Sequence, residues 1–410
     1  MPASRRSHST RTARLALLLA GLALAAALAA GLFACGGQAE PAGGQTGGQA
    51  GGQVLRIGLM ISEGDTLAKL SRAYRDVGEM VRAEMSGGVA RPGHAGGSAQ
   101  VEVRVYSHGE DAESCLRALR LAASEGCQVV IGGALSRQAL PMAALAEELR
   151  VPLISPGSTH PDLVGRRAYV FRTPYDDAFQ ARALARLCRD GGAQTAAVFY
   201  NRADVYASNL AGGFARSFRA LGGRMLAEES YAGESGSLPE AMQALARPRP
   251  DVIFLTGYYA EIPEQVRTIR ATGYAGSIIG PDAWDMISGD QPSDLFGSRF
   301  LVAWHPDAPQ SELGRAFLEQ FTARFGRRPS SVEALVRDAF ALALQAASTA
   351  QTLDARTLRQ ELARIGEFQG VAGRAVYRDG TPERDALVME VSSRGIQYVQ
   401  TIRPEDVARR

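Results

Sequence analysis

The stretch VPLISPGSTHPDL, residues 151–163, begins as a short apolar β-strand and then changes to small residues. Residues 155–159 offer hydroxyl groups, and Gly157 leaves its backbone open to close approach because it has no side chain. In open parallel sheets, ligands bind just outside the carboxyl ends of the strands. The stretch therefore predicts a parallel α/β sheet with a ligand site at the end of this strand.

Short β-branched runs and longer helical segments alternate on both sides of this stretch. Further strands are expected at VLRIGLMI (54–61), VEVRVY (101–106), VVIGG (129–133), AAVFY (196–200), DVIFLTG (251–257) and SIIGP (277–281). Later helices are expected at 311–326, 331–348 and 354–366, before a strand pair around 374–400. The chain has 410 residues, whereas single cores stop growing at roughly 250–300 residues. The pattern therefore predicts two lobes, each a parallel sheet covered by helices on both faces.

The amino terminus has the pattern of an export signal. Four arginines and no acidic residue accompany the apolar run LALLLAGLALAAALAAGLFA, residues 15–34. Leu32-Phe33-Ala34-Cys35 resembles the bacterial lipobox, in which a cysteine receives lipid and becomes the new amino terminus. We expect a lipoprotein signal peptide at 1–34, lipidation of Cys35 and a flexible Gly/Gln-rich tether at 35–53. The alternative is that the run is retained as a membrane-spanning helix.

Charge and motif content exclude several classes of function. After residue 34 the chain carries 41 basic and 43 acidic residues, so it lacks the basic surface of a nucleic-acid-binding protein. The five histidines lack metal-ligand spacing, and no GxSxG turn is present. His160, beside Thr159, is more typical of a capping or rim residue than of a catalytic base. We therefore expect no metal, no cofactor and no enzymatic activity.

Three cysteines follow the tether, and we expect them to be buried thiols. The nearest two are Cys115 and Cys127. A helix is expected over residues 111–125, which separates the pair by about three turns, or roughly 16–18 Å. That separation exceeds the reach of a disulfide.

Two strand exits carry small hydrogen-bonding groups. Ser136 follows VVIGG at the expected start of a helix, where the partial positive charge of the helix terminus adds to its hydroxyl. Ser158 and Thr159, with Gly157, follow the next strand. Uncharged donors of this kind suit a carboxylate that has to be released again. The alternative is that Ser136 and Thr159 are simply helix N-caps.

The second half of the chain offers a counterpart for an ammonium group. Asp282, within GPDAWD (280–285), follows the strand SIIGP. Tyr206 and the pair Tyr258-Tyr259 leave neighbouring strand ends, so an acid and aromatic rings could surround a cleft between the lobes. Trp284 and Trp304 could wall the same pocket. The alternatives are an exposed loop aspartate and aromatic side chains that only pack at a lobe edge.

From about residue 54 to 400 the chain resembles the extracytoplasmic solute-binding proteins of ABC importers, in particular the leucine/isoleucine/valine-binding family. The resembling segments, in order, are VLRIGLM, IGGALS, VPLISPGSTHPDL, YVFRTPYDDAFQ, the Tyr206 segment, DVIFLTGYYAEIPEQVRTIRATGY, IIGPDAWD and VRDAFALAL. The resemblance implies the type I periplasmic-binding fold, with two Rossmann-like lobes joined by three crossings near 174–177, 302–305 and 385–388. Lobe 1 would comprise 54–174 and 305–385, and lobe 2 would comprise 178–302 and 388–410.

The resemblance also implies roles for individual residues. Ser136, Gly157 and Thr159, with neighbouring Ser158, would hold a ligand carboxylate, and Asp282 would bind its ammonium. Tyr206 and Tyr259 would close on the ligand from the second lobe. The chain departs from the family pattern at two places. Ala207 stands where the family usually has glycine, which implies a different local helix entry. The loop 62–74 lacks the usual threonine-glycine pair and carries charges where the ligand side chain often packs.

The function implied is that of a monomeric lipoprotein, anchored outside the cytoplasm, that delivers a small amino acid to a permease in the inner membrane. A branched-chain or related apolar amino acid is the leading ligand. The alternatives are an envelope sensor or regulator of the same fold that binds an amide, an aromatic acid or another small solute, and a hydrolase that has adopted the fold.

Overall fold

A computed structural model describes residues 53–64, 67–92, 97–232, 238–287 and 292–408. Residues 51–410 form one compact unit. The predicted signal peptide, Cys35 and the tether up to Gly52 lie outside the described residues. Within the described residues, no helix is long and apolar enough to cross a membrane.

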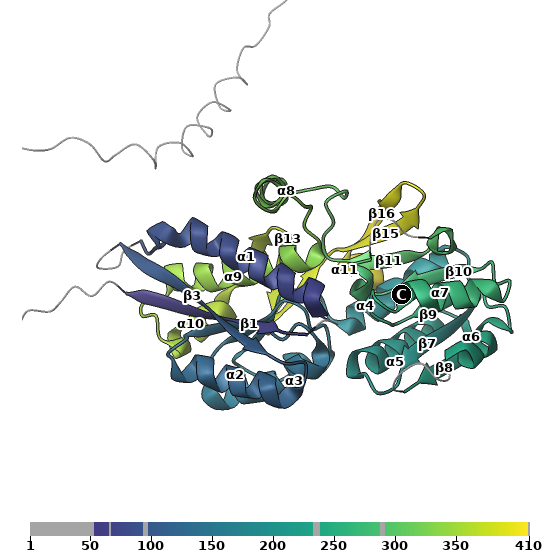
Figure 1. The fold of residues 1–410 in the computed structure, drawn as a ribbon, viewed down its shortest axis with the longest axis horizontal. Helices are drawn as coiled ribbons and strands as arrows, with labels where there is room; N and C mark the ends of the chain where they lie inside the picture. Colours follow the sequence, from purple (N-terminus) through teal and green to yellow (C-terminus); the bar gives the residue numbers. More distant parts are fainter. Residues whose placement is uncertain (1–52, 65–66, 93–96, 233–237, 288–291, 409–410) are drawn as a thin grey trace, which may run out of the picture. The chain divides into compact units, whose positions relative to one another are not determined.

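The first lobe is built on a six-stranded sheet of order β2-β3-β1-β4-β5-β6 (Figure 1). Its strands are parallel except for the short edge strand β2. The strands are β1 (Val54–Ser62), β2 (Val89–Ala90), β3 (Ser98–His108), β4 (Val129–Ile131), β5 (Leu153–Ser155) and β6 (Val170–Arg172).

Helices cover both faces of this sheet. One face packs against α1 (Ala68–Glu84), α9 (Ser331–Thr349) and α10 (Ala355–Arg364), and the other against α2 (Ala112–Ser124) and α3 (Ser136–Leu149) (Figure 1). The period-two alternation of β1 decides the faces: Ile57 and Leu59 join the α1/α9 core, and Met60 joins the α2/α3 core. Helices α9 and α10, which come late in the chain, thus complete the lobe that begins with strands β1 to β6.

The second lobe is built on a seven-stranded sheet of order β16-β15-β11-β10-β9-β7-β8. It is parallel from β11 to β8, and β15 and β16 are antiparallel additions at one edge. The strands are β7 (Thr195–Asn201), β8 (Arg224–Tyr231), β9 (Val252–Leu255), β10 (Ser277–Gly280), β11 (Arg299–Val302), β15 (Ala386–Ser392) and β16 (Gly395–Ile402). The helices are α4 (Asp177–Asp190), α5 (Val205–Ala220), α6 (Leu238–Ala246), α7 (Ile262–Ala271) and the short α11 (Pro404–Ala408).

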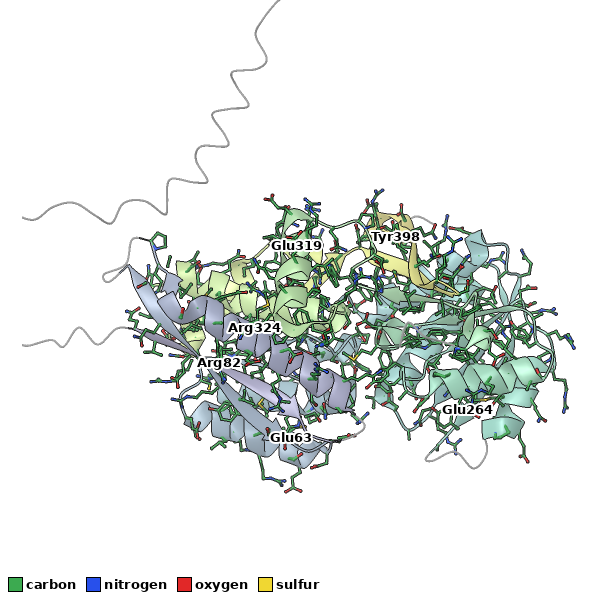
Figure 2. All side chains as sticks on the ribbon, turned by 45° about the horizontal axis from the view of Figure 1, so that its top comes forward. Glu63, Arg82, Glu264, Glu319, Arg324 and Tyr398 are labelled. Carbon is green, nitrogen blue, oxygen red and sulfur yellow. The ribbon has the colours of Figure 1, made fainter. Side chains whose placement is uncertain are left out.

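Two apolar clusters lie on opposite faces of this second sheet. One contains Leu210 of α5 and Val252, and the other contains Ile262 of α7 and Ile253. Glu264 on α7 is exposed at the surface, as is Glu319 on α8 (Glu312–Phe325), a helix that packs in the first lobe (Figure 2). The predicted α/β architecture with two parallel sheets is confirmed.

The predicted strand pair near the carboxyl terminus is wrong in number. Residues 367–402 form five strands: β15 and β16 in the second sheet, and a separate antiparallel sheet of β12 (Glu367–Gly370), β13 (Gly373–Arg378) and β14 (Thr381–Arg384). Tight turns separate these strands, with positive φ at Gly373 and Gly380. Strands β2, β6, β8 and β11 are also absent from the prediction. Strands β2, β6 and β11 have only two to four residues, and β8 is a largely polar, half-buried edge strand.

The chain passes between the two lobes three times: after β6, after β11 and between β14 and β15. A buried ion pair links the first and the last of these passages. Arg384 donates to Asp338 of α9 (3.1 Å) and to the carbonyl oxygen of Thr173 (2.8 Å), and Asp338 also accepts the N–H of Val371 (2.6 Å). One guanidinium therefore links the first crossing, the last crossing and a helix of the first lobe.

The three cysteines of the described chain are free and buried, as predicted. Burial raises the pKa of the Cys115 thiol to about 11. The ring of His108 contacts one of these thiols: its Nδ1 lies 3.2 Å from Cys115 Sγ. Burial lowers the pKa of His108 and raises that of the thiol, so the two groups form a neutral pair and not a reactive thiolate.

Candidate functional site

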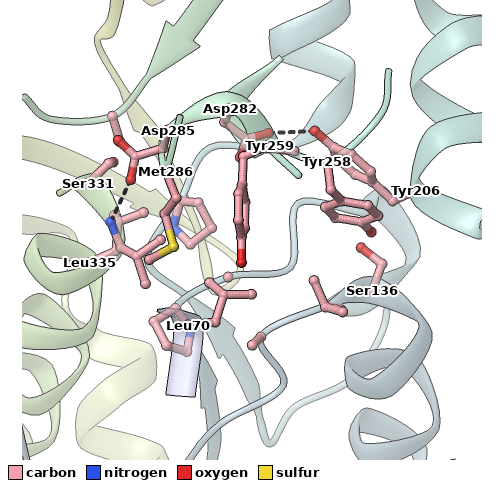
Figure 3. Close-up of a pocket in the computed structure, with 18 of the residues that line it drawn as sticks. Leu70, Ser136, Tyr206, Tyr258, Tyr259, Asp282, Asp285, Met286, Ser331 and Leu335 are labelled. Atoms are coloured by element: carbon pink, nitrogen blue, oxygen red, sulfur yellow. Dashed lines mark hydrogen bonds between the residues drawn. The ribbon is translucent and has the colours of Figure 1, made fainter. Parts of the chain in front are cut away.

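A cavity of about 80 Å³ lies at the carboxyl ends of strands from both sheets (Figure 3). Of the predicted site residues, Ser136, Gly157, Tyr206, Tyr259 and Asp282 line it. Ser158 and Thr159 are not among the lining residues. The other lining residues are Leu70, Tyr74, Ala134, Leu135, Pro156, Pro174, Tyr175, Tyr258, Ala283, Asp285, Met286, Ala303, Ser331, Val332 and Leu335.

Ser136 is the first residue of α3, a 14-residue helix whose N-cap position is Leu135. Leucine makes no side-chain cap, so the helix terminus keeps N–H groups that could receive an anion. Ser136 Oγ lies 3.0 Å from Ser158 Oγ, and the N–H of Ser158 donates to Ser155 Oγ (3.1 Å). Ser136 is therefore not an N-cap, and Ser158 supports it from the next loop.

Gly157 is required for packing as well as for access to the backbone. A Cβ at this position would lie 2.3 Å from the carbonyl oxygen of Ala134. The two strand exits that carry Ser136 and Gly157 are thus pressed together, which brings their polar groups to one end of the cavity.

Thr159 is only 1% exposed and is not among the residues that line the cavity. Its carbonyl oxygen accepts the N–H of Asp177 (2.8 Å), the first residue of α4. Asp177 is also buried and accepts a hydrogen bond from Asn209 Nδ2 (3.0 Å). Burial raises the pKa of Asp177 to about 7, although hydrogen bonds from Thr159 and Asn209 oppose the rise. The N-cap of the 3₁₀ turn that follows, Pro161–Leu163, is His160, so Thr159 is not a helix cap, and its hydrogen bond to Asp177 links it to the start of α4.

Asp282 follows β10 on a short 3₁₀ turn and occupies the opposite wall. Its Oδ1 accepts hydrogen bonds from the hydroxyl of Tyr206 (2.7 Å) and from Gln180 Nε2 (3.0 Å). The backbone N–H of Asp282 donates to Gln180 Oε1 (2.7 Å). Burial raises the pKa of Asp282, and the two side-chain hydrogen bonds lower it. The carboxylate is therefore held in one orientation, and the side chains that hydrogen-bond to it in the described structure, Tyr206 and Gln180, are uncharged.

Tyrosine rings surround this carboxylate. Tyr206 and Tyr258 stack with ring centroids 5.6 Å apart, and the Tyr258 hydroxyl points to Asp204 (3.4 Å). Tyr259 stands between the two ends of the cavity in Figure 3, and Lys69 Nζ lies 5.2 Å from its ring centroid. The sequence analysis identified the pair Tyr258-Tyr259 and assigned only Tyr259 to the site. Tyr258 lines the cavity as well.

Sequence reasoning also missed Asp285 and Tyr175. Asp285 is 9% exposed, and its Oδ2 accepts the N–H of Val332 (3.2 Å) at the start of α9 in the first lobe. Its Oδ1 has no hydrogen-bond partner among the described groups. Burial raises the pKa of Asp285 to about 7. The Tyr175 hydroxyl is also buried without a partner in the described structure.

The two tryptophans do not wall the cavity. Trp284 is 0% exposed and packs on Phe300 in the core of the second lobe, and Trp304 is 3% exposed and packs on Phe317. The interpretation of these residues as ligand contacts is therefore wrong. The aliphatic part of the cavity is lined instead by Leu70, Met286 and Leu335.

Contacts between the lobes flank the cavity. Lys69 of α1 donates to the carbonyl oxygen of Met286 (3.3 Å), and Arg137 of α3 lies 3.8 Å from Asp204, which caps α5. Together with the contact from Asp285 to Val332, these join the lobes at three points. Opening the cavity requires them to break.

This arrangement has the chemistry that a zwitterionic ligand would need. Hydroxyl and N–H donors lie at one end, a carboxylate lies at the other, and aromatic and aliphatic side chains lie between them. Within the described residues, no group of His, Cys, Asp and Glu could hold a metal ion. The described lining residues also include no Arg, Lys or His.

The family model of the periplasmic binding proteins matches residues 54–396. A leucine-specific-binding protein of Salmonella typhimurium is 23% identical over 202 residues, which are 49% of this chain and 54% of that protein. The chain thus matches about half the length of this curated relative.

Solved structures are similar over most of the chain. A leucine-binding protein from Thermotoga maritima has 26% sequence identity and a TM-score of 0.75, covering 86% of this chain and 99% of that one. A branched-chain amino acid transporter substrate-binding protein from Streptococcus pneumoniae, in complex with isoleucine, has 23% identity and a TM-score of 0.76, covering 86% and 100%. With a family model that spans nearly all of the described residues, the chain belongs to the periplasmic binding protein family.

Proposed function

We propose that this protein is the solute-binding component of an ABC importer and that it captures a small amino acid between its lobes. The observation that carries this function is the opposition of Ser136, at the uncapped start of α3, to Asp282 across one cavity. The α-carboxylate of the ligand would accept hydrogen bonds from Ser136 and the neighbouring backbone, and its ammonium would donate to Asp282 Oδ2. The leading class of ligand is branched-chain and related amino acids, in keeping with the relatives named above.

Closure of the two lobes around the ligand is the conformational change that this geometry supports. A ligand that contacts both walls prefers the closed arrangement, so binding shifts the hinge equilibrium. The closed form would then dock on a permease in the inner membrane and release the solute chemically unchanged. We place lobe 1 at 54–174 and 305–385 and lobe 2 at 178–302 and 388–410. Lipidation at Cys35 would hold the protein, as a monomer, at the outer face of the membrane.

A ligand panel tests this function. The purified chain is unfolded and refolded to remove carried-over solute, and thermal unfolding is recorded with amino acids, their amides, aromatic acids and short peptides. A ligand at 100 times its dissociation constant adds about 2.7 kcal/mol to the free energy of unfolding, which separates a binder from the rest. Stabilisation by one class of amino acid supports the proposal. Stabilisation only by aromatic acids or amides, without binding to a permease, supports the sensor or regulator.

A further inference from the structure

The cavity contains more negative charge than a simple zwitterion requires. Two of its lining residues are carboxylates, Asp282 and Asp285, and its described lining contains no basic side chain. A zwitterionic amino acid brings one ammonium, which Asp282 alone can receive, and adds a carboxylate of its own. Asp285 would then remain a buried acid that N–H groups at the start of α9 stabilise but that no cation in the cavity lining or the ligand neutralises.

Asp285 also occupies a separate part of the cavity. In Figure 3, Asp285, Met286 and Leu335 lie on one side of the Tyr259 ring, and Ser136, Tyr206 and Tyr258 lie on the other. The head group of an amino acid held by Ser136 and Asp282 leaves its side chain to reach toward Met286 and Leu335. Asp285 is therefore at the place where the end of a short side chain would lie.

Unused hydrogen-bonding capacity is concentrated at this end. Asp285 is 91% buried, one of its oxygens accepts the Val332 N–H, and the other has no partner in the described structure. The Tyr175 hydroxyl, from a lining residue that is 1% exposed, is likewise unpartnered. Rotation of the carboxyl group about its last torsion has a broad energy profile, so either Asp285 oxygen can be turned to a ligand donor. A buried acceptor without a donor is unfavourable until something supplies one.

We infer that the ligand is an amino acid whose short side chain ends in a hydrogen-bond donor, preferentially an amine, and that Asp285 receives this group. This inference rests on the proposed amino-acid site and refines its substrate class from purely aliphatic to donor-bearing side chains. A second ammonium would neutralise the second carboxylate, and it would keep Asp285 ionised although burial holds the pKa of this group near 7. Met286 and Leu335 would pack on the methylene groups of the same side chain.

The test compares two ligands of nearly equal shape, norvaline and 2,4-diaminobutyrate, which differ by a terminal methyl against a terminal amine. Calorimetry is run at pH 7.5 on the wild-type protein, on Asp285→Asn and on Asp190→Asn. Asp190 is an exposed residue of α4 that pairs with Arg186 on the same helix, so its substitution is a matched control. Diaminobutyrate is expected to bind the wild type roughly tenfold or more tighter than norvaline, as for one hydrogen bond to a charged group.

The variant separates recognition from a merely structural role of Asp285. Because Asp285 also contacts α9, Asp285→Asn can weaken lobe closure for every ligand. A role in recognition requires that the ratio of the two affinities falls by roughly tenfold in Asp285→Asn and stays unchanged in Asp190→Asn. An equal loss for both ligands, or a wild-type preference for norvaline, overturns the inference.

The same experiment distinguishes failure of this inference from failure of the proposed function. If norvaline or a branched-chain amino acid binds in an Asp282-dependent manner and diaminobutyrate does not, the amino-acid site stands and the refinement falls. If no amino acid binds to a protein that unfolds cooperatively, the proposed function falls and this inference falls with it.

Discussion

Replacing Asp282 by asparagine is the most direct test of the site, because the structure predicts how the new side chain will be oriented. Asp282 Oδ1 accepts from the Tyr206 hydroxyl at 2.7 Å and from Gln180 Nε2 at 3.0 Å. Both groups donate, so the amide oxygen of asparagine will take the Oδ1 position. The amide nitrogen then takes the place of Oδ2 and presents a donor to the ligand ammonium.

The expected loss of affinity is large. Removing one partner of a buried, hydrogen-bonded charge pair costs about 2–5 kcal/mol. At about 1.4 kcal/mol per factor of ten, the dissociation constant rises between about 30-fold and several thousand-fold. The stability of the ligand-free protein should change in the other direction. Burial raises the pKa of Asp282, which means that its ionised form is unfavourable in the folded state, and asparagine removes that charge.

Two measurements check this prediction: calorimetric titration with the ligand found in the panel, and thermal unfolding without ligand. The expected result is a strong loss of affinity with an equal or higher melting temperature, and Asp190→Asn should change neither. Unchanged affinity would remove Asp282 from the site. A parallel fall of affinity and melting temperature would show that the variant damages the fold and that the assigned role is unsupported.

Three further predictions follow from the described contacts. Ser136→Ala removes a hydroxyl donor at the start of α3 and should weaken ligand binding by about 1.5–3 kcal/mol in calorimetry; no change would exclude the hydroxyl from the contact. Burial raises the pKa of Asp177 from its ordinary 3.8 to about 7, so the folded state binds its proton more tightly, and the free energy of unfolding should fall as pH rises from about 4 to 7. Asp177→Asn should remove up to about 4 kcal/mol of that fall in denaturant titrations, and an unaltered pH profile would contradict the assignment. Arg384→Met leaves Asp338 buried without its partner and should cost about 3–5 kcal/mol in chemical unfolding, whereas Arg378→Met, at an exposed pair with Glu383, should cost less than about 1 kcal/mol.

The longer buried strands, and the residues Ser136, Gly157 and Asp282 at strand ends, could be predicted from the sequence for a physical reason. Residues that pack on a sheet repeat with period two, and residues that pack on a helix repeat near 3.6, so burial leaves a local pattern. Ser136, Gly157 and Asp282 could be placed because parallel strands bring their carboxyl ends to one edge. The small residues and the acid at those ends were visible in single short stretches.

Other features depend on partners that are distant in the sequence. Asp285 and Trp284 stand side by side in GPDAWD, yet one lines the cavity and the other fills the core of the second lobe. No local pattern distinguishes them, because the difference arises from contact with α9 in one case and with Phe300 in the other. Thr159 also depends on a distant partner: it follows β5, and its carbonyl oxygen accepts the N–H of Asp177 at the start of α4, a contact that no local pattern indicates.

The sequence by itself therefore determined the α/β class, the presence of two lobes, and the strand ends where donors and an acid would gather, because these follow from local periodicity and from chain direction in parallel sheets. Only the tertiary structure decided which polar groups at those ends lack partners. Whether a buried oxygen such as Asp285 Oδ1 has a hydrogen-bond partner depends on all the groups packed around it. Those groups come from segments that are far apart along the chain.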